Sequence, residues 1–448
     1  MRFPLLLSLL PAALLAQTKT AIDFKTVFAS IEINPVKRNV TGSGTYTFEV
    51  NDKKIDTIRI DAQKMEFTQV RINGRDVKFK NSNKQLLLYN GFKKGENTLT
   101  FQYEAFPTQT MYFVNWDFTA DVNEPEKIDG QIWTQGQGKY TSHWLPSFDD
   151  VNEKAIFNLD ITFHKSFEVI ANGNLLARHP SGENFLWQYR MKDPMSSYLV
   201  MIAIGHYEKK MTHSKTGIPL YFYYEDDDKR RYEPTYRYSK DIFDFIEEET
   251  GYKYPWEVYR QVPVRDFLYA GMENTSATIF SRDLVVDSIA FNDRNYINVN
   301  AHELAHQWFG NLVTAQSGKD HWLQEGFATY YALLAEGKLY GEDHFYHKLL
   351  KTAEQLNQAA KTDTTPLWNP KASSLTFYQK GAWALHAIRH QIGREKFNTA
   401  IRNYLKKHAF GNVTTDDFLA EVTAVTPFDT ATFKKQWLEQ GGFPLAHT

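Results

Sequence analysis

The spacing of apolar residues changes once along the chain, and this change most constrains the fold. Between about residues 24 and 207, apolar and polar residues alternate in short runs such as 45–50 and 98–103. A period of two is typical of strands with one buried face. Beyond Gly205 the apolar residues recur every three or four positions, which indicates amphipathic helices. We therefore expect an α+β fold with two domains, an antiparallel β domain (17–206) and a mainly helical domain (207–448).

Turn residues refine this pattern. Asn73-Gly74 separates two alternating runs and predicts a hairpin with a two-residue turn. Gly337 and Gly393 each follow a stretch with helical periodicity, so we expect a helix to end at each of them.

The first residues have the features of a secretory signal peptide. Arg2 precedes an apolar run over 5–15, and Ala16 follows as a small residue before the expected cleavage. A run of about 11 residues is too short to cross a bilayer, which takes about 20. We expect a signal peptide at 1–16 and export to the periplasm or outside the cell. No later run predicts an integral membrane segment.

The composition excludes several classes of function. None of the 448 residues is cysteine, so disulfides, thiolate metal sites and a Cys nucleophile are excluded. The 51 Lys and Arg nearly balance the 53 Asp and Glu, for a formal net charge of −2. This balance gives no broad basic surface for a nucleic-acid partner. Any bound metal ion must be held by His, Asp and Glu.

One predicted helix carries the ligand pattern of a metal site. His302 and His306 are four positions apart, so their imidazoles leave one helix face about one turn from each other. Glu303 follows the first histidine, where its carboxylate can act beside a metal ion without binding it. Eighteen residues separate His306 from Glu325, at the start of another predicted helix. Two antiparallel helices would place Glu325 opposite the histidines, as a third ligand that leaves one zinc position open.

Four motifs, taken in order, resemble those of the aminopeptidase N family of zinc peptidases, which includes the leukotriene hydrolases. They are 270–274 (AGMEN), 302–310 (HELAHQWFG), 322–330 (WLQEGFATY) and 378–382 (YQKGA). The resemblance implies a saddle-shaped N-terminal β domain followed by a thermolysin-like, mainly helical peptidase domain. It also suggests a short form that ends where relatives continue into a further helical domain.

The resemblance assigns the chemistry to five residues. It implies that one Zn²⁺ ion per chain is bound by His302, His306 and Glu325. It makes Glu303 the general base, which takes a proton from water and later passes it to the leaving amine. It makes Tyr378 a hydrogen-bond donor to the oxyanion, so Tyr378→Phe is expected to reduce mainly kcat.

The same resemblance places the substrate. Glu273, with Gln137 of the first domain, would bind the free α-amine of a peptide, and a neutral amide binds an ammonium less strongly than a carboxylate does. Gly271 and Met272 would run beside the peptide as a strand, with Asn274 nearby. The expected partners are therefore peptides with a free N-terminus.

Other functions remain open at this point. One alternative is a bifunctional epoxide hydrolase or an endopeptidase that uses the same zinc. Another is a non-catalytic peptide-binding module, although His302, His306, Glu325 and Glu303 are all present. The oligomeric state and the preferred N-terminal side chain are not indicated by any pattern.

Overall fold

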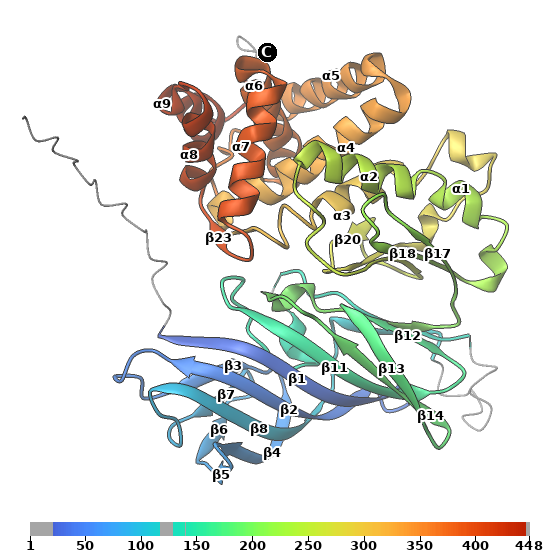
Figure 1. Ribbon diagram of the computed structural model, residues 1–448, viewed down its shortest axis with the longest axis vertical. Helices are drawn as coiled ribbons and strands as arrows, with labels where there is room; N and C mark the ends of the chain where they lie inside the picture. Colours follow the sequence, from blue (N-terminus) through green and yellow to red (C-terminus); the bar gives the residue numbers. More distant parts are fainter. Residues whose placement is uncertain (1–20, 117–128, 139, 445–448) are drawn as a thin grey trace, which may run out of the picture.

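The computed structural model describes residues 21–116, 129–138 and 140–444. A body of strands, blue to green in Figure 1, lies against a second body that carries the long helices, coloured yellow-green to red. The mixed α+β fold predicted from the sequence is confirmed. The predicted signal peptide at 1–16 lies outside the described residues. Within those that are described, no helix is both long and apolar enough to cross a membrane.

The first body is built around one large sheet, in which β1 and β2 are central. In spatial order, its strands are β13 (Asn174–Ser181), β14 (Asn184–Arg190), β11 (Lys154–His164), β1 (Ile22–Asn34), β2 (Asn39–Val50), β8 (Gly95–Ala105), β4 (Met65–Ile72) and β5 (Arg75–Asp76), while β15 (Met195–Ser196) also pairs with β11. Smaller sheets contain β12 (Glu168–Ala171), β16 (Ile202–Gly205), β10 (Gln131–Thr134) and β9 (Met111–Val114), and β3 (Ile58–Asp61), β7 (Gln85–Leu88) and β6 (Phe79–Asn81).

The alternation in the sequence corresponds to burial in this sheet. In β2, Tyr46, Phe48 and Val50 are buried, and Tyr46 lies opposite Leu99 of β8. The predicted hairpin is present between β4 and β5, with Asn73 and its following glycine both at positive φ. Positive φ at both central positions is what a type I′ turn requires.

One expectation for this domain is wrong. The sheet is not wholly antiparallel, because β1 pairs with β11 in parallel, with Val27 opposite Phe157. Parallel and antiparallel strands both show a period of two, so alternation does not reveal direction. All the strands from β2 to β10 lie between these two in the chain, so no hairpin sets their pairing.

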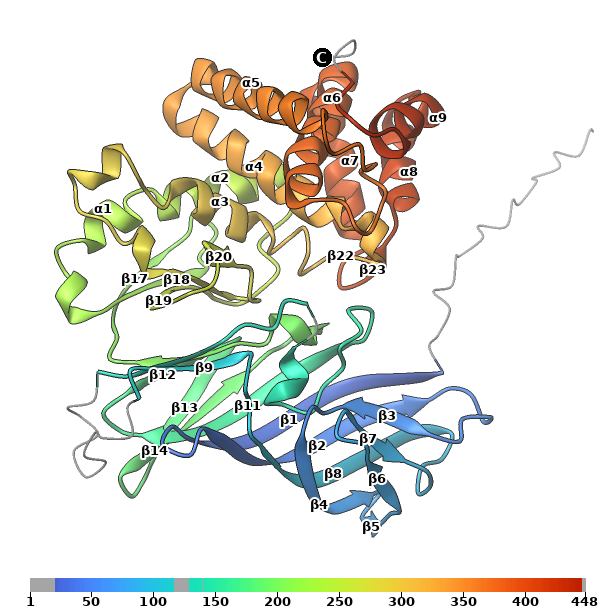
Figure 2. The ribbon, with the colours of Figure 1, turned by 180° about the vertical axis from the view of Figure 1, so that it is seen from behind.

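The second body combines a five-stranded sheet with helices. The sheet has the order β17 (Glu208–His213), β18 (Pro219–Tyr224), β19 (Tyr259–Val264), β21 (Ala277–Ser281) and β20 (Gly271–Met272). Short β22 (Thr314–Ala315) and β23 (Asn412–Val413) form a separate parallel pair. In this sheet β20 is one of the two edge strands, and Figure 2 shows it next to α3 (Ile297–Ala305).

The second body also contains α4 (Trp322–Tyr340), which is buried over most of its length, and the remaining helices. They are α1 (Tyr232–Tyr236), α2 (Ser239–Thr250), α5 (Glu342–Ala359), α6 (Gly381–Ile392), α7 (Arg394–Lys407), α8 (Thr415–Val425) and α9 (Thr430–Phe433), with the π-helical turns η8 (Thr376–Lys380) and η9 (Lys434–Glu439). Short 3₁₀ turns are η2 (Thr141–His143), η3 (Ser197–Leu199), η4 (Asp226–Asp228), η5 (Arg282–Leu284), η6 (Ala290–Asn292) and η7 (Gly318–Asp320).

The two glycines expected to end helices behave differently. Gly393 lies between α6 and α7 at a φ of +83°, as a helix stop should. Gly337 does not end a helix, because α4 continues to Tyr340. A Cβ atom at position 337 would lie 2.9 Å from Cβ of Phe345, so the glycine allows α5 to approach α4 closely.

Buried polar contacts join the two bodies. Asn172 of the first donates to the carbonyl of Thr275 in the second at 2.6 Å, and Arg260 of β19 donates to the carbonyl of Gly173 at 2.6 Å. Lys154, at the start of β11, is partly buried and donates to three carbonyls of the second body. These contacts hold the β domain against the loops that surround the site.

Candidate active site

The three predicted metal ligands come together at the end of α3 and the start of α4. His302 Nε2 lies 3.1 Å from His306 Nε2, and Glu325 Oε2 lies 3.4 and 3.3 Å from these two nitrogens. Ligands held by zinc at 2.0–2.1 Å in a tetrahedron are separated by about 3.3–3.4 Å. The triangle therefore has the dimensions of one face of a zinc site.

The hydrogen bond of His306 orients its ring for metal binding. Its Nδ1 lies 2.9 Å from the carbonyl oxygen of Phe309, which can only accept, so Nδ1 carries the proton. The lone pair of the neutral ring is then on Nε2, directed at the triangle. Such a bond on the far nitrogen is what fixes the tautomer of a metal-binding histidine.

The electrostatics of this triangle favour a cation. Both oxygens of the Glu325 carboxylate are buried without a hydrogen-bond partner. Burial by itself lowers the pKa of His306, but the carboxylates of Glu325, Glu273 and Glu303 raise it to about 10. Without a metal ion the ring therefore holds a second proton at neutral pH, which metal binding would displace to give the neutral ligand. Burial lowers the pKa of His302, which favours the neutral ring that a ligand needs. The residues present therefore fit a zinc ion.

Glu303 lies between this triangle and the edge strand. Its carboxylate faces Gly271, where a Cβ atom would lie 2.5 Å from Oε1. Burial raises the pKa of Glu303 well above its usual range, with His306 opposing this effect and Glu273 adding to it. The close approach of β20 to the Glu303 side chain thus requires glycine at position 271.

Glu273 follows β20 and shares the same space. One oxygen each of Glu273 and Glu303 and one nitrogen of His306 all lie within 4.8 Å of one another. The Glu273 side chain is buried, and its Oε1 has no hydrogen-bond partner. Its backbone carbonyl accepts from Asn311 Nδ2 at 2.7 Å, a residue of the loop after α3. This hydrogen bond joins the segment that follows β20 to the loop that follows α3.

Tyr378 reaches the site from the π-helical turn η8. Its ring stacks on that of His302, with centroids 5.4 Å apart and 6° between the planes. Burial raises the pKa of the Tyr378 phenol, and the carboxylates of Glu325, Glu273 and Glu303 raise it further. The hydroxyl therefore stays protonated and available as a donor.

The remaining predicted residues differ in how they meet the site. Gly271 and Met272 form β20, which pairs with Phe280 and Ile279 of β21. Asn274 is buried and donates to the carbonyl of Leu199 in the β domain at 3.4 Å.

Gln137 is the one least engaged with the others. Its side chain makes no hydrogen bond to Glu273 in the described part of the chain, while its backbone N–H donates to Gln135 Oε1 at 2.5 Å. Gln135 is buried, and its Nε2 has no partner.

Two further residues at the site were missed from the sequence. Nε2 of His321 lies 3.3 Å from Oε1 of Glu325. Tyr198 of the β domain is fully buried, and its hydroxyl accepts from Gln324 Nε2 at 3.4 Å. The sequence offers a partial signal for His321, which lies four positions before Glu325, although it precedes the helix predicted to begin near Glu325. No signal existed for Tyr198, since its partner is distant in the chain.

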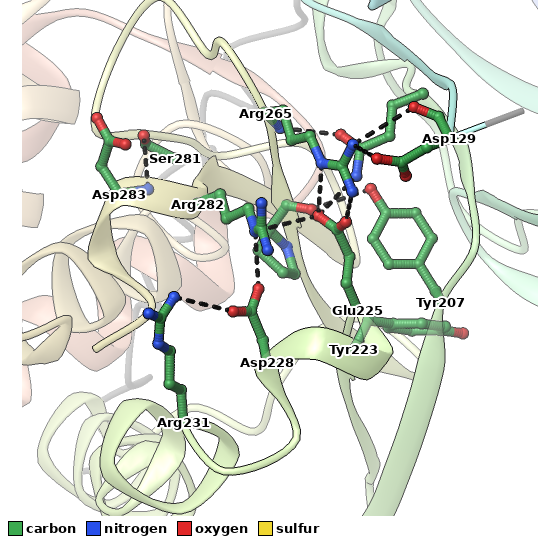
Figure 3. Close-up of polar contacts among 12 residues, drawn as sticks. Asp129, Tyr207, Tyr223, Glu225, Asp228, Arg231, Arg265, Ser281, Arg282 and Asp283 are labelled. Carbon is green, nitrogen blue, oxygen red and sulfur yellow. Dashed lines mark hydrogen bonds and ion pairs between the residues drawn. The ribbon is translucent and has the colours of Figure 1, made fainter. Parts of the chain in front are cut away.

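A cavity of about 460 Å³ lies elsewhere in the second body, lined by three arginines and three aspartates among others. The arginines are already paired. Arg265 contacts Asp129 and Glu225, Arg282 contacts Glu225 and Asp228, and Arg231 contacts Asp228, as Figure 3 shows. This network joins the two bodies through Asp129 and does not present uncompensated positive charge.

The fold and site together define a metallohydrolase with a two-histidine, one-glutamate centre. Comparison with known proteins places it further: residues 24–199 match the peptidase M1 N-terminal domain, and residues 235–437 match the peptidase family M1 domain. The chain belongs to peptidase family M1. Members of this family are zinc-dependent, in agreement with the predicted cofactor. The resemblance to the aminopeptidase N family, expected from the four sequence motifs, is confirmed.

Curated relatives agree with this family. Glutamyl aminopeptidase of Bos taurus is 29% identical over 67% of this chain and 33% of its own length. Leucyl aminopeptidase of Saccharolobus solfataricus is 26% identical over 87% of the chain and 50% of its own length. Aminopeptidase N of Lactobacillus helveticus is 26% identical over 93% and 51%. The chain thus spans about half or less of the length of these relatives.

Proposed function

We propose that this protein is a zinc-dependent aminopeptidase that removes N-terminal residues from peptides. The observation that carries the proposal is the position of Glu273, whose carboxylate lies within 4.8 Å of the Glu303 carboxylate and of His306. A second buried carboxylate so close to a metal ligand and a general base has no role in water activation. It is suited to binding a cation that belongs to the substrate.

The free α-amine of a peptide is that cation. Its nitrogen and the first carbonyl carbon are only two bonds apart, about 2.5 Å. An ammonium on Glu273 therefore puts the first peptide bond, and no later one, beside Glu303. Burial raises the pKa of Glu273, and a bound ammonium restores the carboxylate form by opposite charge. An acylated N-terminus offers no such charge.

Glu303 has the environment of a proton carrier. When bound, zinc polarises the scissile carbonyl and lowers the pKa of water to about 7. Glu303 takes the proton of the attacking water and then gives it to the leaving amine nitrogen. Its raised pKa allows the carboxyl to hold this proton between the two transfers.

Tyr378 and the edge strand complete the proposed site. The protonated hydroxyl of Tyr378 donates to the carbonyl oxygen as negative charge develops on it. Gly271 and Met272 present the outer side of an edge strand, to which an extended peptide can add as a further strand. Asn274 and Gln137 are assigned to the wall around the α-amine, with Gln135 beside them.

Export by the predicted signal peptide, and hence a periplasmic or secreted location, forms part of the same proposal.

A matched pair of substrates tests the proposal. Leucine 4-nitroanilide has a charged amine, which its N-acetyl derivative replaces with a neutral amide. We expect turnover of the first alone, abolished by a chelator, restored by Zn²⁺ and absent in Glu303→Gln. Equal turnover of both would indicate an endopeptidase. If the zinc-loaded protein cleaved no aminoacyl 4-nitroanilide, whatever its N-terminal residue, the result would favour the non-catalytic peptide-binding module.

A further inference from the structure

His321 contacts the carboxylate of Glu325 from outside the metal triangle. Its Nε2 lies 3.3 Å from Oε1, while the two ligand histidines face Oε2 at 3.4 and 3.3 Å. The ligand atoms that lie within 4.8 Å of one another come from His302, His306 and Glu325, and His321 does not join them. The two oxygens of one carboxylate therefore face different partners.

The backbone of His321 is held firmly at the start of α4. Its carbonyl accepts from the backbone N–H of Gln324 at 2.9 Å and of Glu325 at 3.2 Å. The preceding Asp320 is fully buried and accepts from the backbone N–H and the hydroxyl of Thr415, both at 2.8 Å. The backbone on both sides of the imidazole is therefore held in place.

The ring of His321 is also fixed by an aromatic contact. Phe377 packs on it edge to face, with centroids 5.2 Å apart and 89° between the planes. Phe377 directly precedes Tyr378 in η8. The imidazole, 35% exposed, thus lies between the proposed zinc ligand Glu325 and the turn that carries Tyr378.

We propose that His321 is a positioning residue for the metal site: its Nε2 donates to Oε1 of Glu325, and this keeps Oε2 directed at His302 and His306. Oε1 makes no hydrogen bond to the described residues, and Nε2 of His321 faces it at 3.3 Å. A carboxylate ligand without a partner on its second oxygen is free to rotate or to bind through both oxygens. Loss of such an outer partner typically weakens metal binding by about 10–100-fold.

Zinc affinity tests the proposal without reference to peptide cleavage. The wild type and the variants His321→Leu, His321→Gln and His321→Asn are stripped of metal, and their zinc dissociation constants are measured by competition with a fluorescent chelator. His390→Leu, an exposed histidine on α6, is the matched control. Because the readout is metal binding, an inactive wild type would contradict the proposed function and leave this test intact.

The expected order follows from the donor. His321→Leu should bind zinc about 10–100-fold more weakly, and His321→Gln, whose amide nitrogen mimics Nε2, should remain close to the wild type. In His321→Asn the side chain is too short to reach Glu325, so this variant should resemble His321→Leu. If circular dichroism shows that His321→Leu does not fold, the comparison of His321→Gln with His321→Asn tests the proposal. The visible spectrum of the cobalt-substituted protein should change in His321→Leu and not in His390→Leu. Wild-type affinity in both His321→Leu and His321→Asn, or equal losses in all three variants, would overturn the proposal.

Discussion

The ring of Tyr378 lies parallel to the ring of His302, with 6° between their planes and 5.4 Å between their centroids. One face of the proposed zinc ligand is therefore covered by the residue that we assign to the oxyanion. The stacking belongs to the ring of Tyr378, and the proposed catalytic role belongs to its hydroxyl. These two contributions can be separated by a single substitution.

Tyr378→Phe should keep the stack and remove the donor. We expect kcat to fall about 10²–10³-fold, the magnitude seen when one oxyanion donor is lost. KM and the zinc content should change little, because the ring still covers His302. Steady-state kinetics with leucine 4-nitroanilide and metal analysis of the purified protein check both parts. A matching loss of zinc would mean that the hydroxyl supports the metal site and not the oxyanion.

Glu273→Gln should alter recognition of the amine while preserving the shape of the side chain. A hydrogen bond to a charged group contributes about 1.5–3 kcal/mol, so kcat/KM for a free N-terminus should fall about 10–100-fold. The acetylated substrate, which the wild type is expected to leave uncleaved, should stay uncleaved in the variant. The kcat/KM for the free-amine substrate, measured with the zinc content of the variant, is the informative quantity. An unchanged kcat/KM at full zinc content would separate Glu273 from amine binding.

Removal of zinc should destabilise the second body. A ligand present at about 1,000 times its dissociation constant stabilises the folded state by about 4 kcal/mol. We expect the midpoint of thermal unfolding to fall on addition of a chelator. In Glu325→Ala, which lacks one ligand, the chelator should shift the midpoint far less. Equal shifts in the two proteins would place the bound zinc elsewhere.

Features that depend on residues close together in the chain could be predicted from the sequence, whereas features that depend on distant residues could not. The histidine pair and Glu303 belong to one helix, so their spacing alone predicted their geometry. The buried faces of β2 and β8 followed from alternation. By contrast, the parallel pairing of β1 with β11 depends on segments that are far apart in the chain. The alternation of apolar residues does not show whether two strands pair in parallel or antiparallel.

The residues missed at the site show the same limit. The close contact of Gly337 with Phe345 and the position of Tyr198 arise only when helices and domains pack. His321 is a partial exception, because its spacing from Glu325 is helical. A histidine near a glutamate on a helix is nevertheless common on protein surfaces, so the spacing acquired meaning only beside the other two histidines. Lys154 was equally invisible, since its three acceptors lie more than 150 positions away.

Lys154 gives a prediction about pH. Its Nζ donates to the carbonyls of Asn311 and Leu312 at 3.3 Å and of Gly411 at 3.1 Å. Burial lowers the pKa of this lysine from its ordinary 10.5 to about 7. Between pH 7 and 10.5 the unfolded chain therefore binds more protons at this site than the folded one. The free energy of unfolding should then rise with pH through that window, by up to about 1.4 kcal/mol per pH unit.

The difference between Lys154→Met and the wild type isolates this effect, because other titrating groups are common to both. Urea unfolding from pH 7 to 10, in the presence of a chelator, should show the wild type gaining stability over Lys154→Met as the pH rises. Below pH 7 the lysine is protonated in both states, so the difference should become constant. Lys229→Met, at an exposed position, is the matched control. A constant difference for Lys154→Met would show that the buried ammonium keeps its ordinary pKa.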